Sequence, residues 1–425
     1  MPERHRKSRR RSVVRHTRSR QGRPVVRALG LVLTAVLAFG ASAAASVALR
    51  LQSNVDKIDL DGLVVAASPS VTREPDPDDP NAGSPVNILL IGSDQRTGEN
   101  EAIGGANSSM ASDTTIVAHI SADRTRVELV SIPRDSMVRM PSCTATNGKT
   151  SRTSSKAQFN SAFATGWSLG GDIASAAACT MSAVQENTGL TLDHVAVVDM
   201  AGFQQMIDAI GGVDICIPDA MQDKYTGLNV AAGNQHLDGV TALQFARARH
   251  VVGSDGSDLT RIGNQQRLLS AVMTEVLSKN LVADVPELLS FMSAATSSLT
   301  TDGGLTVQTM VGLAYSARSL SGGGITFLTI PNGPDPADPN RVVWTSAADT
   351  VWSNMVQDLP VVASETTVPT TAATSAATTP PTGSATTGAT SPTTTVDPAT
   401  VPTPAETKTA GREPFTGDDV TAVCG

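Results

Sequence analysis

Arginine and aspartate residues gather at the ends of segments that have the composition of buried strands. They occupy four short stretches: 92–96, 112–114, 131–135, and 247–249 with Asp258, Arg261 and Gln265 downstream. Strand ends that open into loops are where α/β folds place their ligands. We therefore expect these side chains to meet at one site.

Two of the arginines, Arg247 and Arg249, are separated by a single residue. In an extended segment, residues two apart point to the same face. Adjacent guanidinium groups repel each other unless an anion lies between them, and the planar fork of arginine binds phosphate oxygens in pairs. The pair thus favours a phosphate ligand, although on its own it is explained at least as well by solvated surface arginines or by ion pairs with aspartate.

Two aspartates, Asp94 and Asp113, each follow a serine at a predicted strand boundary. Carboxylates beside phosphate-binding arginines suit Mg²⁺ (or Mn²⁺), since such ions take oxygen ligands and bridge phosphate oxygens. The metal would neutralise a departing phosphate group. The alternative is that each aspartate caps a turn.

The elements that must hold these residues alternate between strands and helices. Apolar patterns predict strands at 86–91, 114–120, 126–132, 194–198 and 213–217, and helices at 171–189, 200–210, 237–246 and 262–277. The second and third strands form a hairpin around 121–124. Such alternation predicts an α/β fold, an α-β-α sandwich whose mixed central sheet is covered by helices.

The N-terminal part predicts a membrane anchor. Eleven of the 32 Lys and Arg residues lie in residues 1–27, and residues 28–49 carry no formal charge. That length crosses the hydrocarbon core as a transmembrane helix, and the charges place 1–27 in the cytoplasm and the catalytic body outside. A cleaved signal peptide is the alternative, because 41–43 resembles a cleavage site. The acidic body argues against nucleic acid as its partner.

Polar segments bound the part that folds. Residues 50–85 predict a stalk and a proline-rich linker, and the folded domain is expected over 86–360. Residues 361–411 are mostly Thr, Ala, Pro, Ser and Gly, which cannot bury enough apolar surface to fold. The tail 412–425 regains apolar residues and can dock back on the core.

Cysteine usage agrees with an exported chain. The four cysteines are scattered, with no spacing typical of a zinc site. Two disulfides are expected, and three pairings are possible. Cys143 and Cys179 bracket one segment, so we favour Cys143–Cys179, which leaves Cys216–Cys424.

Taken together, the ordered motifs resemble the LytR-CpsA-Psr family. The motifs are 87–96, Ser-Asp-Thr at 112–114, Ser-Ile-Pro-Arg-Asp at 131–135, 159–163, 202–214, and 237–239 leading to Ala-Arg-Ala-Arg at 246–249. The resemblance implies an enzyme of Gram-positive cell walls, here of actinobacterial type. It would move a glycan polymer from a polyprenyl-pyrophosphate carrier to peptidoglycan through a phosphodiester.

The resemblance also implies roles for single residues. Asp94 and Asp113 would be associated with Mg²⁺. The pyrophosphate pocket would consist of Arg96, Arg134, Arg247, Arg249, Arg261 and Gln265. Asp94, Arg247, Arg249 and Asp258 would take part in catalysis, with the general base open between Asp94 and Asp258. The lipid tail would lie in an apolar slot, for which the candidates are Val195, Val197, Ile207 and Ile210.

Two positions depart from the pattern of the family. Many members have Arg where this chain has Ala111, and Lys where it has Gln158, so two positive charges are missing from the expected cage. Metal, or Arg139 and Lys149, would have to compensate. A non-catalytic binder of the glycan or its carrier is therefore a second hypothesis, and pyrophosphate hydrolysis a third. A transcription regulator is disfavoured by the outward topology.

Overall fold

The computed structural model describes residues 46, 49–64, 83–96, 98–105, 110–251, 256–278, 285–317, 320, 322–362, 408–417 and 419. Residues 1–50 and 51–425 are separate compact units, and the second carries the elements described below. The predicted anchor, 28–49, lies outside the described residues apart from Ser46 and Leu49. None of the helices in the described part is both long and apolar enough to span a bilayer.

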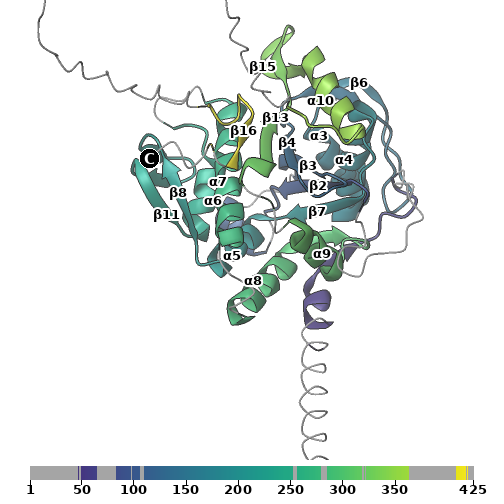
Figure 1. The fold of residues 1–425 in the computed structure, drawn as a ribbon. Coiled ribbons are helices and arrows are strands. Elements are labelled where there is room, and N and C mark those ends of the chain that lie inside the picture. The colour runs from purple at the N-terminus through teal and green to yellow at the C-terminus, as the bar shows by residue number, and fades with distance from the viewer. Residues whose placement is uncertain are drawn as a thin grey trace, which may run out of the picture. The chain divides into compact units, whose positions relative to one another are not determined.

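An eight-stranded mixed sheet forms the centre of the domain (Figure 1), in the order β1-β12-β7-β2-β3-β4-β13-β16. The strands are β1 (Asp56–Ile58), β2 (Val86–Ser93), β3 (Ser112–Ile120), β4 (Val127–Ser131), β7 (His194–Val198), β12 (Leu299–Asp302), β13 (Ile325–Thr329) and β16 (Phe415–Thr416). β3 runs antiparallel to both β2 and β4, whereas β7 is parallel to β2 and β13 is parallel to β4. The predicted hairpin and mixed sheet are confirmed.

Helices cover both faces of the sheet. The helices are α2 (Glu99–Gly104), α3 (Ser161–Gly170), α4 (Ile173–Thr188), α5 (Met200–Ala209), α6 (Gly239–Arg247), α7 (Asp258–Ser278), α8 (Val285–Ser298), α9 (Val307–Ala317) and α10 (Ser346–Val356), with a 3₁₀ turn, η1 (Gly322–Gly324). On one face Leu89 and Val117 pack with Phe163 of α3. On the other, Ile116 and Leu129 belong to a cluster against which α7 packs. Successive residues of these strands point to opposite faces of the sheet, and both sets include apolar side chains. Helices therefore have to cover both faces.

Aspartate caps explain where several helices begin. Asp199 accepts the backbone N–H of Gly202 at the start of α5, and Asp238 accepts that of Thr241 at the start of α6. The cap at Asp238 is why α6 begins at Gly239 and not at the predicted Leu237. Gly189, in the left-handed region at φ 70°, ends α4.

Four two-stranded sheets stand outside the central one. They are β5 (Met137–Met140) with β6 (Ser154–Gln158), β8 (Val213–Ile217) with β11 (Gly233–Leu237), β9 (Met221–Asp223) with β10 (Leu228–Val230), and β14 (Asn332–Asp335) with β15 (Asp338–Trp344). The strand–helix–strand pattern at 194–217 is therefore present, but β8 leaves the main sheet and pairs with β11.

Two segments expected to be linkers contribute to the domain. Within the predicted linker, residues 56–58 form edge strand β1, parallel to β12. At the other end, Gly411 donates its backbone N–H to Gln266 of α7 at 3.0 Å, inside the segment we expected to be disordered. Phe415 then stacks on Phe327 at 5.0 Å between ring centroids, so the C-terminal tail does return to the core. The remainder of that segment, 363–407, lies outside the described residues.

Candidate active site

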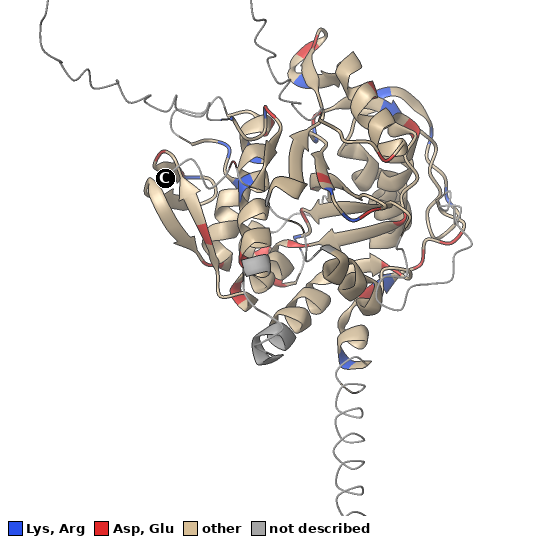
Figure 2. Cartoon of the chain, in the orientation of Figure 1, with Lys and Arg blue, Asp and Glu red and all other residues tan. Residues whose placement is uncertain are grey.

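The strand directions bring the predicted site residues to one edge of the sheet. β2 ends at Ser93, antiparallel β3 begins at Ser112, and β4 ends at Ser131. Asp94, Asp113 and Arg134 therefore leave the sheet on the same side, roughly one strand spacing of 4.8 Å from one to the next. In Figure 2 acidic and basic segments are interspersed along the described chain.

Asp113 is the central carboxylate of the cluster. Its Oδ1 lies 2.7 Å from Nη1 of Arg134 and 3.5 Å from Nη1 of Arg261, and its carbonyl accepts Nη2 of Arg261 at 2.7 Å. Burial alone would raise the pKa of Asp113, but the positive charges of Arg261 and Arg134 outweigh it and hold that pKa below its ordinary value. Asp113 therefore stays ionised.

Asp258, the first residue of α7, connects the same two arginines. Its Oδ1 lies 2.6 Å from Nη2 of Arg261 and 3.6 Å from Nε of Arg134. Burial raises the pKa of Asp258 above its ordinary value in spite of these charges. The buried Nε groups of Arg134 and Arg261 have no hydrogen-bond acceptor within the described part of the chain. Nε of Arg134 nevertheless lies within ion-pair distance of two carboxylates, at 3.6 Å from Asp258 and from Asp135.

Arg96 is held by its neighbour Asp94. Its Nε and Nη2 donate to the carboxylate at 2.7–3.0 Å, and its Nη1 donates to the carbonyl of Gly104 at 2.8 Å. The hydrogen bonds to Asp94 raise the pKa of Arg96, and the charge of Asp113 adds to the effect. The pair therefore belongs to the cluster, with its own charges matched.

Arg247 and Arg249 reach the cluster in a different way from the one predicted. Arg247 is the last residue of α6, and Arg249 follows after Ala248, whose ψ of 128° breaks the helix. The prediction that the two share one face of an extended segment is wrong. Both arginines are nevertheless close enough to the cluster to interact with it electrostatically. The positive charge of Arg247 lowers the pKa of Asp113. Burial and the positive charges of Arg134 and Arg261 lower the pKa of Arg249.

Polar side chains fix the backbone that carries these arginines. Gln265 donates to the carbonyl of Ala246 at 3.2 Å, and Asn264 to that of Ala248 at 3.3 Å. Buried Asp223 accepts the backbone N–H of Arg249 and that of His250, each at 3.0 Å. Gln265, predicted to touch the head group, thus holds the segment in place. Asn264 and Asp223 were not predicted, since Asn264 lies inside a helix and the short strand β9, which ends at Asp223, was not among the predicted strands.

The family can now be assigned. The sequence profile described as the LytR_cpsA_psr family matches residues 47–357. The chain belongs to the LytR-CpsA-Psr family. It is 30% identical over 279 residues to a probable cell wall biosynthesis protein, LcpB, of Corynebacterium glutamicum, with 64% of this chain and 61% of that protein aligned. It is 36% identical to the cell wall biosynthesis protein LcpA of the same organism over 36% of this chain and 28% of LcpA. The chain spans less than two thirds of either protein.

Two further proteins are less similar to this chain in sequence. A protein of Enterococcus faecalis named polyisoprenyl-teichoic acid–peptidoglycan teichoic acid transferase TagU is 28% identical, with 57% of this chain and 69% of that one aligned. Among solved structures, Bacillus subtilis TagV is 22% identical with a TM-score of 0.50, covering 65% of this chain and 98% of TagV. The last likeness concerns the fold alone.

Gln158, one of the two departures from the family pattern, forms a hydrogen bond with Asp135, the neighbour of Arg134. Gln158 donates from Nε2 to Oδ1 of Asp135, and Nη1 of Arg341 lies 2.6 Å from the same oxygen. Arg139, proposed to compensate, is exposed and pairs with Glu186 at 3.1 Å. Lys149 is exposed in the loop between β5 and β6. Arg341 was not predicted, because nothing near it in the sequence resembles a motif.

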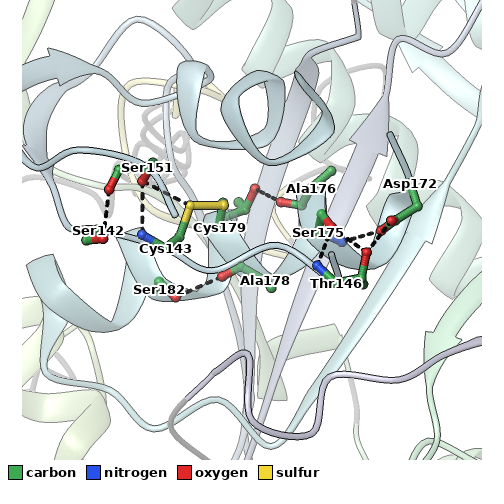
Figure 3. The surroundings of a disulfide bond; sticks show 11 residues. Ser142, Cys143, Thr146, Ser151, Asp172, Ser175, Ala176, Ala178, Cys179 and Ser182 are labelled. Carbon is green, nitrogen blue, oxygen red and sulfur yellow. Dashed lines mark hydrogen bonds between the residues drawn. A yellow bond between two sulfur atoms is a disulfide. The ribbon is translucent and has the colours of Figure 1, made fainter. Parts of the chain in front are cut away.

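A disulfide supports this side of the site (Figure 3). Cys143, in the loop between β5 and β6, is bonded to Cys179 of α4, as predicted. The same loop donates the backbone N–H of Thr146 to Oγ of Ser175 at 3.0 Å. The loop leads into β6, which ends at Gln158. Cys216 is also disulfide-bonded, and its predicted partner, Cys424, lies outside the described residues.

The four candidates for the lipid slot do not line one space. Val195 and Val197 belong to the core against α4, whereas Ile207 and Ile210 belong to a separate cluster, and all four are buried. Half-buried apolar side chains occur instead between the sheet and α7. They are Ile88 and Leu90 of β2, and Leu269 and Met273 of α7.

Proposed function

We propose that this chain transfers a glycan polymer from a polyprenyl-pyrophosphate carrier to peptidoglycan. The observation that carries the proposal is the surplus of arginines over aspartates at one sheet edge, where Arg134 and Arg261 share the carboxylates of Asp113 and Asp258. Membership of the LytR-CpsA-Psr family, and the name of its relative TagU, support the same reaction class. The domain would act outside the cytoplasm, tethered to the cell membrane by residues 28–49.

The reaction is an in-line phosphoryl transfer. A hydroxyl of peptidoglycan attacks the phosphorus nearer the sugar, and the bond from that phosphorus to the bridging oxygen breaks. Polyprenyl phosphate leaves, the new phosphodiester joins glycan to peptidoglycan, and the hydroxyl proton passes to a base. Arg134, Arg249 and Arg261 supply fixed positive charge where negative charge develops, which is the main contribution a protein makes to such a step.

Asp258 is the better placed of the two candidate bases. Burial raises its pKa, and a carboxylate with a raised pKa accepts a proton more readily. Asp94 is instead a candidate ligand for a metal ion, and a metal-bound carboxylate has a lowered pKa and is a poor base. We therefore assign the proton to Asp258. An Asp258→Asn variant should lose transfer while still binding the carrier.

Asp94 and Asp113 would hold Mg²⁺ or Mn²⁺ together with the pyrophosphate. Magnesium binds one or two carboxylates beside substrate phosphates, and this donor set fits that pattern. Among the described residues no group of three or more His, Cys, Asp or Glu side chains could hold a metal alone. Bound there, the ion would neutralise charge on the leaving phosphate. The lipid tail would lie between β2 and α7, along Ile88 and Leu269.

Two substitutions test the assignment. Arg249→Ala and Asp94→Ala should each abolish turnover of a polyprenyl-pyrophosphate-linked glycan, while circular dichroism and the melting temperature stay close to those of the parent. Arg139→Ala is the matched control, because Arg139 is exposed and paired with Glu186. Full turnover in either site variant would refute the assignment. Binding of the carrier without any turnover by the parent protein would instead support the non-catalytic alternative.

A further inference from the structure

The C-terminal segment 408–417, which we call the strap, packs against the N-terminal half of α7 (Figure 1). Ala410 and Gly411 meet the backbone of α7 at Leu259 and Gly263. The strap then enters β16, which pairs with β13 of the central sheet. α7 is also the helix whose first turn carries Asp258 and Arg261 of the cluster, so the strap contacts α7 within a turn of these two site residues.

Two glycines permit this close approach. A Cβ on Gly263 would lie 2.9 Å from the carbonyl carbon of Ala410 and nearer still to its oxygen. A Cβ on Gly411 would lie 2.8 Å from the backbone nitrogen of Gly263 and would overlap the carbonyl oxygen of Leu259. Carbon atoms touch at about 3.5–4.0 Å, so a side chain at either position would push the strap and the helix apart. Glycine is unfavourable inside a helix compared with alanine, and here the strap gives the reason for it.

Gln266 of α7 joins the strap to the sheet. The side chain is 1% exposed, and its Oε1 accepts the backbone N–H of Gly411 at 3.0 Å. Its Nε2 donates to Oγ of Ser131 at 3.1 Å and to Oγ1 of Thr329 at 3.2 Å. Ser131 and Thr329 are paired residues at the ends of β4 and β13, and Arg134 follows Ser131 by three positions. Without the strap, Oε1 would lose its donor while buried, so the network favours the docked strap.

The strap has its own means of staying in place. Within its turn, the carbonyl of Thr409 accepts the N–H of Glu413 at 3.0 Å, and Oε2 of Glu413 accepts the N–H of Thr409 at 2.7 Å. Beyond the turn, Phe415 is 3% exposed and stacks on Phe327 of β13. The segment that meets α7 is therefore held by a local turn on one side and by an apolar anchor on the other.

The strap and the cluster use different sides of α7. The cluster uses positions 258, 261 and 265, whereas the strap meets positions 259, 263 and 266. With 3.6 residues per turn, these two sets point in different directions from the helix axis. Arg261 donates to the carbonyl of Asp113 on the side of the cluster at 2.7 Å. The first two turns of α7 are thus held between the site and the strap.

We propose that the strap positions α7 for catalysis, so that Asp258 and Arg261 keep the geometry that phosphoryl transfer requires. The inference rests on the proposed function for the roles of these two residues. Gly411 and Gln266 are positioning residues, which act through the backbone of α7 and the end of β4. Catalytic groups have to be held to within about 0.5 Å by the residues around them, and a helix fixed from a second side meets that requirement.

The test introduces one methyl group where the strap meets α7, in the full chain in nanodiscs. Gly263→Ala should displace the strap although alanine favours the helix, so the melting temperature should stay close to that of the parent. The kcat for transfer of the carrier-linked glycan should fall about tenfold or more, since misplacement of a catalytic group by about 1 Å costs roughly 10²-fold. The KM for the carrier should change little, because Arg134 and Arg249 still bind it.

Gly411→Ala approaches the same contact from the strap and should give the same loss of kcat. Its matched control is Gly189→Ala. Both glycines have a left-handed backbone, with φ of 85° and 70°, but a Cβ on Gly189 would meet nothing within 4 Å. The control therefore carries similar backbone strain without moving the strap, and it should keep the kcat of the parent.

Hydrogen exchange followed by mass spectrometry gives a readout that needs no substrate. Amides of 259–266 should exchange faster in Gly263→Ala and Gly411→Ala than in the parent, while those of α4 keep their rates. Unchanged exchange over 259–266, or faster exchange there with full kcat, would overturn the positioning role and leave the proposed function intact. Faster exchange throughout the domain would also overturn it, because the strap would then only stabilise the fold. A parent without turnover would contradict the proposed function, and exchange over 259–266 would then decide alone whether the strap holds α7.

Discussion

Arg341 places its Nη1 2.6 Å from Oδ1 of Asp135, the oxygen to which Gln158 also donates. The β14–β15 hairpin is fastened there by its backbone: Val342 donates to the carbonyl of Asp135 at 3.2 Å. Asp135 also lies 3.6 Å from Nε of Arg134. The β14–β15 hairpin therefore places the positive charge of Arg341 beside Gln158, where many members of the family have a lysine. With Asp135 neutralised, Arg134 remains turned toward Asp113.

Removing that charge should weaken catalysis without unfolding the domain. In Arg341→Ala, Asp135 would compete for Arg134, and we expect turnover to fall about tenfold, the effect of losing one charge-assisted contact of roughly 1.4 kcal/mol. Steady-state transfer assays measure it. Adding Gln158→Lys should restore turnover, because a cation would again reach the same carboxylate oxygen. Unchanged turnover in Arg341→Ala would show that the hairpin arginine has no such role.

Asp223 should act on catalysis through the backbone of Arg249. The Asp223→Ala variant frees the N–H groups of Arg249 and His250, so the guanidinium loses its fixed position. Misplacement of a catalytic group by about 1 Å costs roughly 10²-fold in rate, and we expect kcat to fall by that order. Asp214→Ala is the control, because Asp214 is exposed on neighbouring β8 and pairs with His236. Equal kcat values in the two variants would contradict the positioning role.

Stability should depend on pH through Glu128. Burial raises the pKa of this β4 carboxyl above 4.5, although it accepts the N–H of Val361 and lies near Arg126. The native state therefore keeps the proton to higher pH than the unfolded chain does. The free energy of unfolding falls as pH rises from the unfolded pKa through the raised one.

In the Glu128→Gln variant the side chain has no carboxyl proton to lose, so this fall in the free energy of unfolding should be absent. The variant should melt at a higher temperature than the parent at pH 8 and at nearly the same temperature below about pH 4, where both side chains are neutral. Thermal unfolding followed by circular dichroism across this range measures the difference. A variant that is less stable than the parent at pH 8 would mean that the ionised carboxylate is needed in the folded state.

The Cys143–Cys179 disulfide closes a loop with a sequence separation of 36. Replacing both cysteines by alanine should lower the free energy of unfolding by about 2–4 kcal/mol, because the unfolded chain gains freedom. Urea titration of the non-reduced proteins measures this and leaves the bond of Cys216 in place. A loss below 1 kcal/mol would indicate that the hydrogen bonds of the Thr146 loop hold it without the bond.

Sequence periodicity predicted the strands that carry the site. Val86–Ser93 and His194–Val198 are short apolar runs that end at a glycine or an aspartate, so their burial and ends follow from composition alone. The predicted hairpin accounts for the edge shared by Asp113 and Arg134, whereas Asp94 reaches it through the pairing of β2 with β3, which was not predicted. Local rules suffice wherever neighbours in sequence are also neighbours in the sheet.

What the sequence could not provide depends on contacts between distant segments. Arg341 and Asp135 are 206 residues apart, and the hairpin that carries Arg341 has only three consecutive apolar residues, 342–344, too short a run to predict a strand. Arg247 was expected in an extended segment, but α6 continues one residue beyond the predicted end at 246, and Phe245 of its last turn packs in the core. Val197 and Ile207 both look buried in the sequence, and only the fold shows that they belong to different clusters.

A doubly labelled donor shows whether the glycan is transferred together with its phosphate. The purified full chain is given a polyprenyl-pyrophosphate glycan with ³²P at the phosphorus nearer the sugar and ³H in the sugar, with Mg²⁺ and peptidoglycan. We predict that both labels enter peptidoglycan in equal amounts while unlabelled polyprenyl phosphate is released, and that Arg249→Ala stops all three. Tritium entering peptidoglycan without ³²P would show that the glycan is transferred without its phosphate, and so contradict the proposed phosphoryl transfer.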